Sequence, residues 1–242
     1  MKRRLLMLLS VFMTITSVGW LQAQDTSGDG YTKTGNDYRV TTAEGLQNVL
    51  KELNNVTAAQ TTTITLANDL DITGSSSSGI KSMGPNQDWQ GIFFFDNAIT
   101  KYVNLTINGN GKQIYGNNTS QSSIADYASK TYVFYIHGGV SAEYNGKLTF
   151  SDLKVSNTNI IGFNIFNIKG VVFNKVSLLN NAEGGLHLNS SELEATDFTT
   201  NSNGKFAVKL SRERANKPKF TLKSGTIDET NVPQIAYYAT LA

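Results

Sequence analysis

The amino-acid sequence predicts an all-β fold, a parallel β-helix (solenoid) of about six coils that begins with an N-terminal amphipathic helix. Two observations lead to this prediction. Short β-type runs recur at a nearly constant interval, beginning at Leu148, Val171, Leu193 and Phe220, and a second series of runs follows the first at a nearly fixed distance. One repeat has too little apolar surface to fold alone, so successive repeats must stack and bury a shared core.

The N-terminus has the pattern of a cleavable secretory signal. Basic residues at positions 2–4 precede a mostly apolar run over residues 5–20, and the small residue Ala23 closes the region. Threonine and glycine residues interrupt the run, which argues against a retained transmembrane helix. We therefore expect residues 1–23 to be a signal peptide that exports the protein to the periplasm, the outer surface or the medium. Residues 24–38 are rich in Gly, Ser, Thr and Asp, which is typical of a flexible leader.

Charge and cysteine content exclude several classes of partner. The chain has 21 basic and 19 acidic residues, and three basic ones lie in the signal, which leaves 18 − 19 = −1 for the mature chain. Such a surface has no electrostatic footprint for nucleic acid or anionic lipid. The chain has no cysteine, so disulfides, thiolate metal sites and attachment of lipid to a cysteine are excluded. We expect no cofactor, no metal and, after cleavage, no transmembrane anchor.

A helix is predicted over residues 41–53. Thr41 and Glu44 match a capping box, in which the threonine side chain caps free backbone N–H groups. Apolar residues then recur at i, i+3, i+4 and i+7 from Leu46 to Leu53, which gives one apolar stripe. This helix opens the predicted β-helix domain, residues 39–242, and we expect it to cover the exposed strand edge of the first coil.

The repeat is defined by four inward positions. In the first copy the apolar residues lie at offsets 0, 2, 5 and 7, and asparagines at offset 9 of the first two copies, Asn157 and Asn180, indicate either a stacked amide ladder or ordinary turns. The template is Leu148, Phe150, Leu153 and Val155, and its further copies begin at Val171, Leu193 and Phe220. The second runs begin at Gly162, Gly185, Lys205 and Gln234.

The N-terminal half extends the pattern with longer connections. First runs near positions 64 and 105 are followed by second runs near positions 91 and 132, so the connection between the two runs is clearly longer than in the C-terminal half. Each of these coils therefore carries an insertion. Since successive coils stack, we expect the two insertions to lie side by side, and long loops on a rigid scaffold often carry function. The insertions are residues 74–90 and 116–130.

One stretch resembles a known family. Thr41-Thr42-Ala43-Glu44-Gly45-Leu46-Gln47, followed by Ile64–Ile72 and Leu105–Ile114, is similar to the opening of pectate-lyase-like β-helix domains of bacterial surface and adhesive proteins. The similarity is close over residues 40–116 and architectural beyond them. It implies a right-handed parallel β-helix with a helical cap and a secreted or surface role. It transfers no catalytic residue, because lyases, hydrolases and adhesins share this fold.

Candidate ligand-binding residues fall in two places. Those in and directly after the insertions are Asp88, Trp89, Tyr127 and Tyr132, and those on the outward face of the second runs are Tyr135, His187 and Lys209. Aromatic faces pack on sugar rings, while polar groups bind hydroxyls. The alternative interpretation is that the loop aromatics anchor the loops and that the histidines only decorate a solvated strand.

These residues favour a binding protein over an enzyme. A pectate-lyase-type reaction needs clustered carboxylates for Ca²⁺ and a base, whereas the outward second-run positions bring no two carboxylates together. We predict an adhesive or glycan-contacting module whose partner is an extracellular or cell-wall polysaccharide or a surface molecule. Its open C-terminal end could also pair with another chain or domain. The alternatives are a polysaccharide lyase or glycoside hydrolase that uses the same groove, and a structural stalk.

Overall fold

The structure is a computed structural model, and it is mostly β with parallel sheets, in agreement with the predicted all-β class. It describes residues 26–72, 91–95, 97–116, 132–139, 147–158, 160–230 and 232–238. Three predicted features, the signal, Trp89 with Asp88, and Tyr127, lie outside these residues.

The described strands form two sheets, which we call the first and the second sheet. The first has 13 strands, which include β1 (Thr26–Gly28), β2 (Tyr31–Thr34), β3 (Asp37–Val40), β4 (Gln60–Leu66), β5 (Leu70–Asp71), β7 (Val103–Asn108), β8 (Gln113–Tyr115), β10 (Leu148–Ser156), β12 (Val171–Leu179), β14 (Glu192–Thr196), β15 (Phe198–Asn201), β17 (Lys219–Leu222) and β18 (Gly225–Asp228). The second has six, namely β6 (Gly91–Phe95), β9 (Tyr132–His137), β11 (Ile161–Phe166), β13 (Gly184–Asn189), β16 (Phe206–Ser211) and β19 (Ile235–Tyr238).

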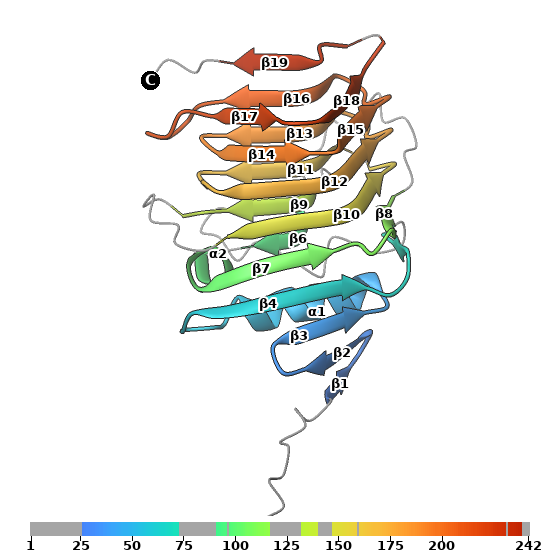
Figure 1. The fold of residues 1–242 in the computed structure, drawn as a ribbon, viewed down its shortest axis with the longest axis vertical. Coiled ribbons are helices and arrows are strands. Elements are labelled where there is room, and N and C mark those ends of the chain that lie inside the picture. Colours follow the sequence, from blue (N-terminus) through green and yellow to red (C-terminus); the bar gives the residue numbers. More distant parts are fainter. Residues whose placement is uncertain are drawn as a thin grey trace, which may run out of the picture.

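From β4 onward the chain alternates between the sheets, and every passage, which we call a coil, adds strands to both (Figure 1). All pairs from β3 upward are parallel. The predicted repeat is confirmed at the level of register, since Leu148 pairs with Val171, Val171 with Leu193, and Leu193 with Phe220. Phe163 likewise pairs with Phe134 and with Leu186 in the second sheet.

The core lies between the two sheets. Alternate residues of each strand point inward, and a column of fully buried phenylalanine rings runs through successive coils. Ring centroids are 5.3 Å apart for Phe93 and Phe134, 4.6 Å for Phe134 and Phe163, and 4.8 Å for Phe163 and Phe173. Each such ring removes a large apolar area from water, so this column is a main source of cohesion between coils.

A bend in the first sheet recurs at equivalent positions of three successive coils. Asp152, Lys175 and Asp197 have φ of 46°, 58° and 52°, in the left-handed region that side chains usually avoid. The bend lets β12 pair with β14 before it and with β15 after it. The side chains at the bend bind one another, because Lys175 Nζ lies 2.7 Å from Asp152 Oδ1 and Ser224 Oγ donates to Asp197 Oδ1 at 2.8 Å.

An amide ladder exists, but it lies one residue beyond the predicted position. Asn157 and Asn180 adopt φ of 55° and 54°, so they supply the left-handed turn. The residues after the turn carry the buried hydrogen bonds: Asn181 Nδ2 donates to Asn203 Oδ1 at 2.8 Å, and Asn203 Nδ2 donates to Glu229 Oε1 at 2.7 Å. Of the two interpretations of Asn157 and Asn180, the turn is therefore confirmed, and the residues that follow the turn form the buried ladder.

The N-terminal helix is α1 (Ala43–Leu53), and its cap lies one residue later than predicted. Thr42 is the N-cap, and its hydroxyl accepts a hydrogen bond from the Gly45 N–H at 3.0 Å. Thr41 was the predicted cap, but its own hydroxyl and N–H both donate to the carbonyl of Gly30. A second helix, α2 (Asn97–Tyr102), leads from β6 to β7 and is too short to produce a periodic pattern.

Helix α1 covers the end of one sheet rather than of both. It packs against β6, the last strand of the second sheet at this end, and its apolar side chains join the common core (Figure 1). The first sheet instead continues past β4 through β3, β2 and β1. The helix was expected to cover the strand edge of the first coil. It covers the second sheet at this end, whereas β1, β2 and β3 extend the first sheet.

The predicted flexible leader, residues 24–38, is corrected over its described part. Residues 26–40 form β1, β2 and β3, of which β3 pairs in parallel with β4. The reason is that Tyr38 is buried against the core and its hydroxyl donates to Glu52 Oε1 at 2.8 Å. Lys33 forms an ion pair with the same carboxylate. The polar composition of this segment gave no sign of these contacts, which are made with residues of α1 and the first sheet.

Candidate binding face on the second sheet

The outward side chains of the second sheet form two columns, as the alternation in the sequence predicted. Four adjacent strands contribute, namely β9, β11, β13 and β16. The column that we call the inner column contains Tyr135, Asn164, His187 and Lys209. The neighbouring outer column contains His137, Phe166, Asn189 and Ser211.

Aromatic rings stack along the lower part of both columns. The Tyr132 and Tyr135 centroids lie 5.6 Å apart, those of Tyr135 and His137 lie 6.3 Å apart, and those of His137 and Phe166 lie 4.8 Å apart with an interplanar angle of 5°. Tyr135 is only 4% exposed, while Tyr132 remains partly accessible. Of the two candidate ligand-binding tyrosines on this face, Tyr132 is therefore partly accessible to solvent and Tyr135 is buried.

The loop between β16 and β17 folds back over this face. The backbone N–H groups of Glu213 and Arg214 donate to Ser190 Oγ at 3.0 Å and 2.7 Å. The Arg214 guanidinium lies 5.6 Å from the Phe166 ring centroid, which is a cation–π distance. Sequence reasoning did not single out Arg214. The available signal was the interval between the third and fourth copies, Leu193 to Phe220, because a longer repeat leaves room for such a loop.

Two titratable groups of the inner column, those of His187 and Tyr135, are held in neutral form. His187 Nε2 lies 2.7 Å from Ser211 Oγ, and burial, with a smaller contribution from Lys209, lowers the pKa of His187 to about 3. Burial also raises the pKa of the Tyr135 hydroxyl, with the charges of Tyr132 and Glu213 adding to the shift. Near neutral pH the column therefore presents an uncharged imidazole and an uncharged phenol.

One acceptor in this column has no partner. Asn164 lies between Tyr135 and His187, is 7% exposed, and its Oδ1 atom makes no hydrogen bond. An unpaired buried amide oxygen is costly, so it is a group that gains from a bound donor. The column thus combines a buried acceptor without a partner with aromatic rings and the Lys209 ammonium.

The predicted residues are only partly brought together. His187 and Lys209 are direct neighbours, as are Tyr132 and Tyr135, but His137 lies in the outer column two strands away from His187. Among the described residues, no three His, Cys, Asp or Glu side chains gather as metal ligands would. The two imidazoles are therefore not direct neighbours.

Trp89, Asp88 and Tyr127 lie outside the described residues, and the described strands that flank the two insertions are neighbours. Leu70 and Asp71 in β5 pair with Ile114 and Tyr115 in β8, and Gly91 in β6 pairs with Tyr132 in β9. Both insertions thus leave from paired strands and return to paired strands. No described helix has the length and apolar character needed to cross a membrane.

Comparison with protein-family models, with curated proteins and with solved structures gives no match.

Proposed function

We propose that this chain is an exported right-handed parallel β-helix, capped by α1, of the pectate-lyase-like type that its N-terminal residues resemble. Parallel pairing from β3 upward supports this proposal, as do the coils that begin in register at Leu148, Val171 and Leu193. The folding back of α1 under β6 supports a capping role, because it occupies the edge that a further strand would otherwise pair with.

Its function is to bind an extended glycan or a surface partner through the outward face of the second sheet and the adjoining insertions. The observation that carries this proposal is the inner column with its neighbours. It sets the Tyr132 ring, the unpaired oxygen of Asn164, the neutral imidazole of His187 and the Lys209 ammonium on successive strands. Strands repeat about every 4.8 Å. Such a ladder suits a polymer that presents hydroxyl groups along its length.

The proposal is tested by measuring binding to a panel of neutral and acidic polysaccharides. Tyr132→Ala and Lys209→Ala should each weaken binding at least roughly tenfold, which corresponds to one lost ring or charged contact. Lys154→Ala is the matched control, because Lys154 is an exposed lysine on the first sheet. Equal affinities for all three variants would contradict a site on the second sheet.

The insertions are tested separately. If Trp89 contacts the glycan, Trp89→Ala should weaken binding, whereas full retention would leave the outward columns as the binding surface. The same incubations distinguish the rival function, because a polysaccharide lyase or glycoside hydrolase would release unsaturated products or reducing ends. A binding module would show affinity without turnover. N-terminal sequencing of the exported protein tests the cleavage expected after Ala23.

A further inference from the structure

A hollow of about 240 Å³ lies on the outward side of the first sheet, across the first residues of β12, β14 and β17. Val172, Glu194 and Thr221 line it and pair with one another in register. Glu192 and Lys219 line it two residues earlier on β14 and β17, where they also pair. Since the core lies between the two sheets, this hollow faces away from the candidate binding face on the second sheet.

The hollow is formed by short side chains on a rigid base. Val172 and Thr221 are shorter than the glutamates beside them, and Gly170 at the entry to β12 has no side chain. Gly170 has φ of 77°, which glycine adopts freely, and open space lies where a Cβ atom would stand. Beneath the hollow, Val171 and Leu193 are buried in the core. Strands therefore fix its shape before any ligand arrives.

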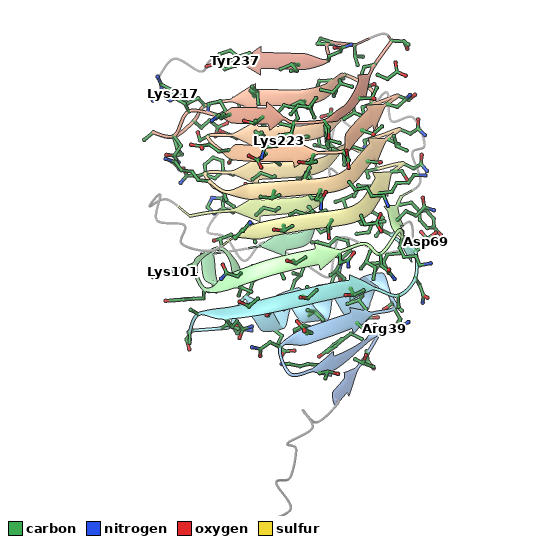
Figure 2. All side chains as sticks on the ribbon, viewed as in Figure 1. Arg39, Asp69, Lys101, Lys217, Lys223 and Tyr237 are labelled. Atoms are coloured by element: carbon green, nitrogen blue, oxygen red, sulfur yellow. The ribbon has the colours of Figure 1, made fainter. Side chains whose placement is uncertain are left out.

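The two carboxylates of the hollow are held by lysines at different places. Glu192 Oε1 lies 3.8 Å from Lys169 Nζ, and Glu194 Oε1 lies 2.5 Å from Lys223 Nζ. Figure 2 shows Lys223 on the outward side of this sheet, near β14 and β17. A carboxylate has about four lone-pair positions, so each one can still accept hydrogen bonds from a ligand after it has bound its lysine.

The charges of the hollow favour a neutral ligand that carries hydroxyl groups. A charged ligand would have to compete with Lys169 or Lys223 for a carboxylate, whereas a hydroxyl group can donate to the carboxylate and leave the ion pair in place. Val172 adds an apolar contact for C–H groups. The volume is below the roughly 300–1,000 Å³ of pockets that enclose a whole small molecule. It suits one unit of a polymer.

We propose that this hollow binds one sugar unit of a neutral glycan. The hydroxyl groups of the sugar donate to Glu192 and Glu194 and accept from Lys219, and its ring lies on Val172. The class of ligand rests on the proposed function, but the site is on the other sheet, so either site can fail without the other. With a site on each sheet, one molecule can hold two glycan strands.

Methyl NMR spectroscopy tests this site directly. Protein with ¹³C-labelled valine methyl groups is titrated with neutral oligosaccharides of glucose, mannose, xylose or galactose. At least one of them should shift the Val172 signals saturably, and the shift should change little with salt because the ligand has no charge to screen. Thr221→Trp places an indole ring in the hollow and should abolish the shift. Thr106→Trp is the control, on the outward face of β7 two strands away from Val172.

Both substituted threonines are partly exposed, so both variants should keep the circular dichroism spectrum of the parent protein. Tyr132→Ala changes the second sheet and should leave the Val172 shift unaltered. If Tyr132→Ala does not weaken glycan binding and the Val172 shift remains, the second-sheet site fails and the hollow stands. Three results would overturn the hollow as a site: no Val172 shift with any of these sugars at millimolar concentration, a shift that survives Thr221→Trp, or a shift that only acidic oligosaccharides cause and that salt removes.

Discussion

The middle coils, from β10 to β16, and the last described coil, from β17 to β19, share one sequence pattern. They differ in the number of described coils that pack against them. Phe163, Leu186 and Val208 occupy one inward position of the second sheet and are fully buried, while Ile235 continues that position and is half exposed. The residue types are alike. Burial in this architecture therefore depends on having a coil on both sides, and an apolar residue at an inward position does not by itself form a core.

The two regions also differ in how their polar ladders end. In the middle coils Asn181 and Asn203 each receive and donate hydrogen bonds along the stack. In the last coil the ladder ends at Glu229, a buried carboxylate that only accepts from Asn203. The comparison predicts that equivalent substitutions will cost more in the middle coils than at the end.

Phe163→Ala should have the largest effect. The ring contacts Phe134, Phe150 and Phe173 in three strands, so its removal should lower the free energy of unfolding by about 3–5 kcal/mol. Ile235→Ala should cost less than about 1 kcal/mol, because its side chain remains half in water. Urea unfolding of both variants measures the difference. Equal losses would mean that the last coil is covered in solution.

Asn203→Ala should have the next largest effect. It leaves the Asn181 backbone N–H without its acceptor and removes the side-chain hydrogen bond to Glu229 Oε1, so we expect a loss of about 2–3 kcal/mol. Asn157→Gly is the control, since glycine adopts the left-handed turn freely and Asn157 lies outside the ladder. Thermal unfolding should separate the two variants clearly. A comparable loss at Asn157 would restore the ladder to the position predicted from sequence.

Acid should destabilise the protein through His187. Its folded pKa of about 3 lies below the unfolded value of 6.5, so between these pH values the unfolded state binds the additional proton. Stability from this group is present above pH 6.5 and is lost as the pH falls, by at most about 1.4 kcal/mol per pH unit. His187→Gln should reduce the difference between urea midpoints at pH 7 and pH 5. The equivalent residue of the last coil, Ala236, has no such group.

Thr200→Val should stabilise the protein. Thr200 takes an apolar position of the repeat, is fully buried, and its hydroxyl oxygen has no hydrogen-bond partner. Valine has nearly the same shape, so removal of the unpaired hydroxyl should add about 1 kcal/mol to the free energy of unfolding. Ile227 pairs with Thr200 from the last coil and shows that an apolar side chain suits this column. A measured loss of stability would indicate a partner for the hydroxyl in solution.

The repeat could be read from the sequence because parallel stacking places equivalent residues on top of one another. Leu148, Val171, Leu193 and Phe220 therefore share one chemical environment and one residue class, and their spacing gave the register of the first sheet. The alternation also gave the outward columns that contain His187 and Lys209. A pattern of period two determines which face of a strand each side chain occupies.

Local sequence patterns could not predict which side chains are covered, because the covering residues lie far away along the chain. Tyr38 is buried because Glu52 and the core residues of α1 lie against it. These contacts explain why residues predicted to be a flexible leader form strands. Arg214 folds back over Phe166 from a loop whose sequence is simply polar. The sequence by itself determined the period, the register and the inward residues. Tertiary structure decided which polar segments are ordered and which apolar ones remain open, because both depend on neighbours that lie far away along the chain.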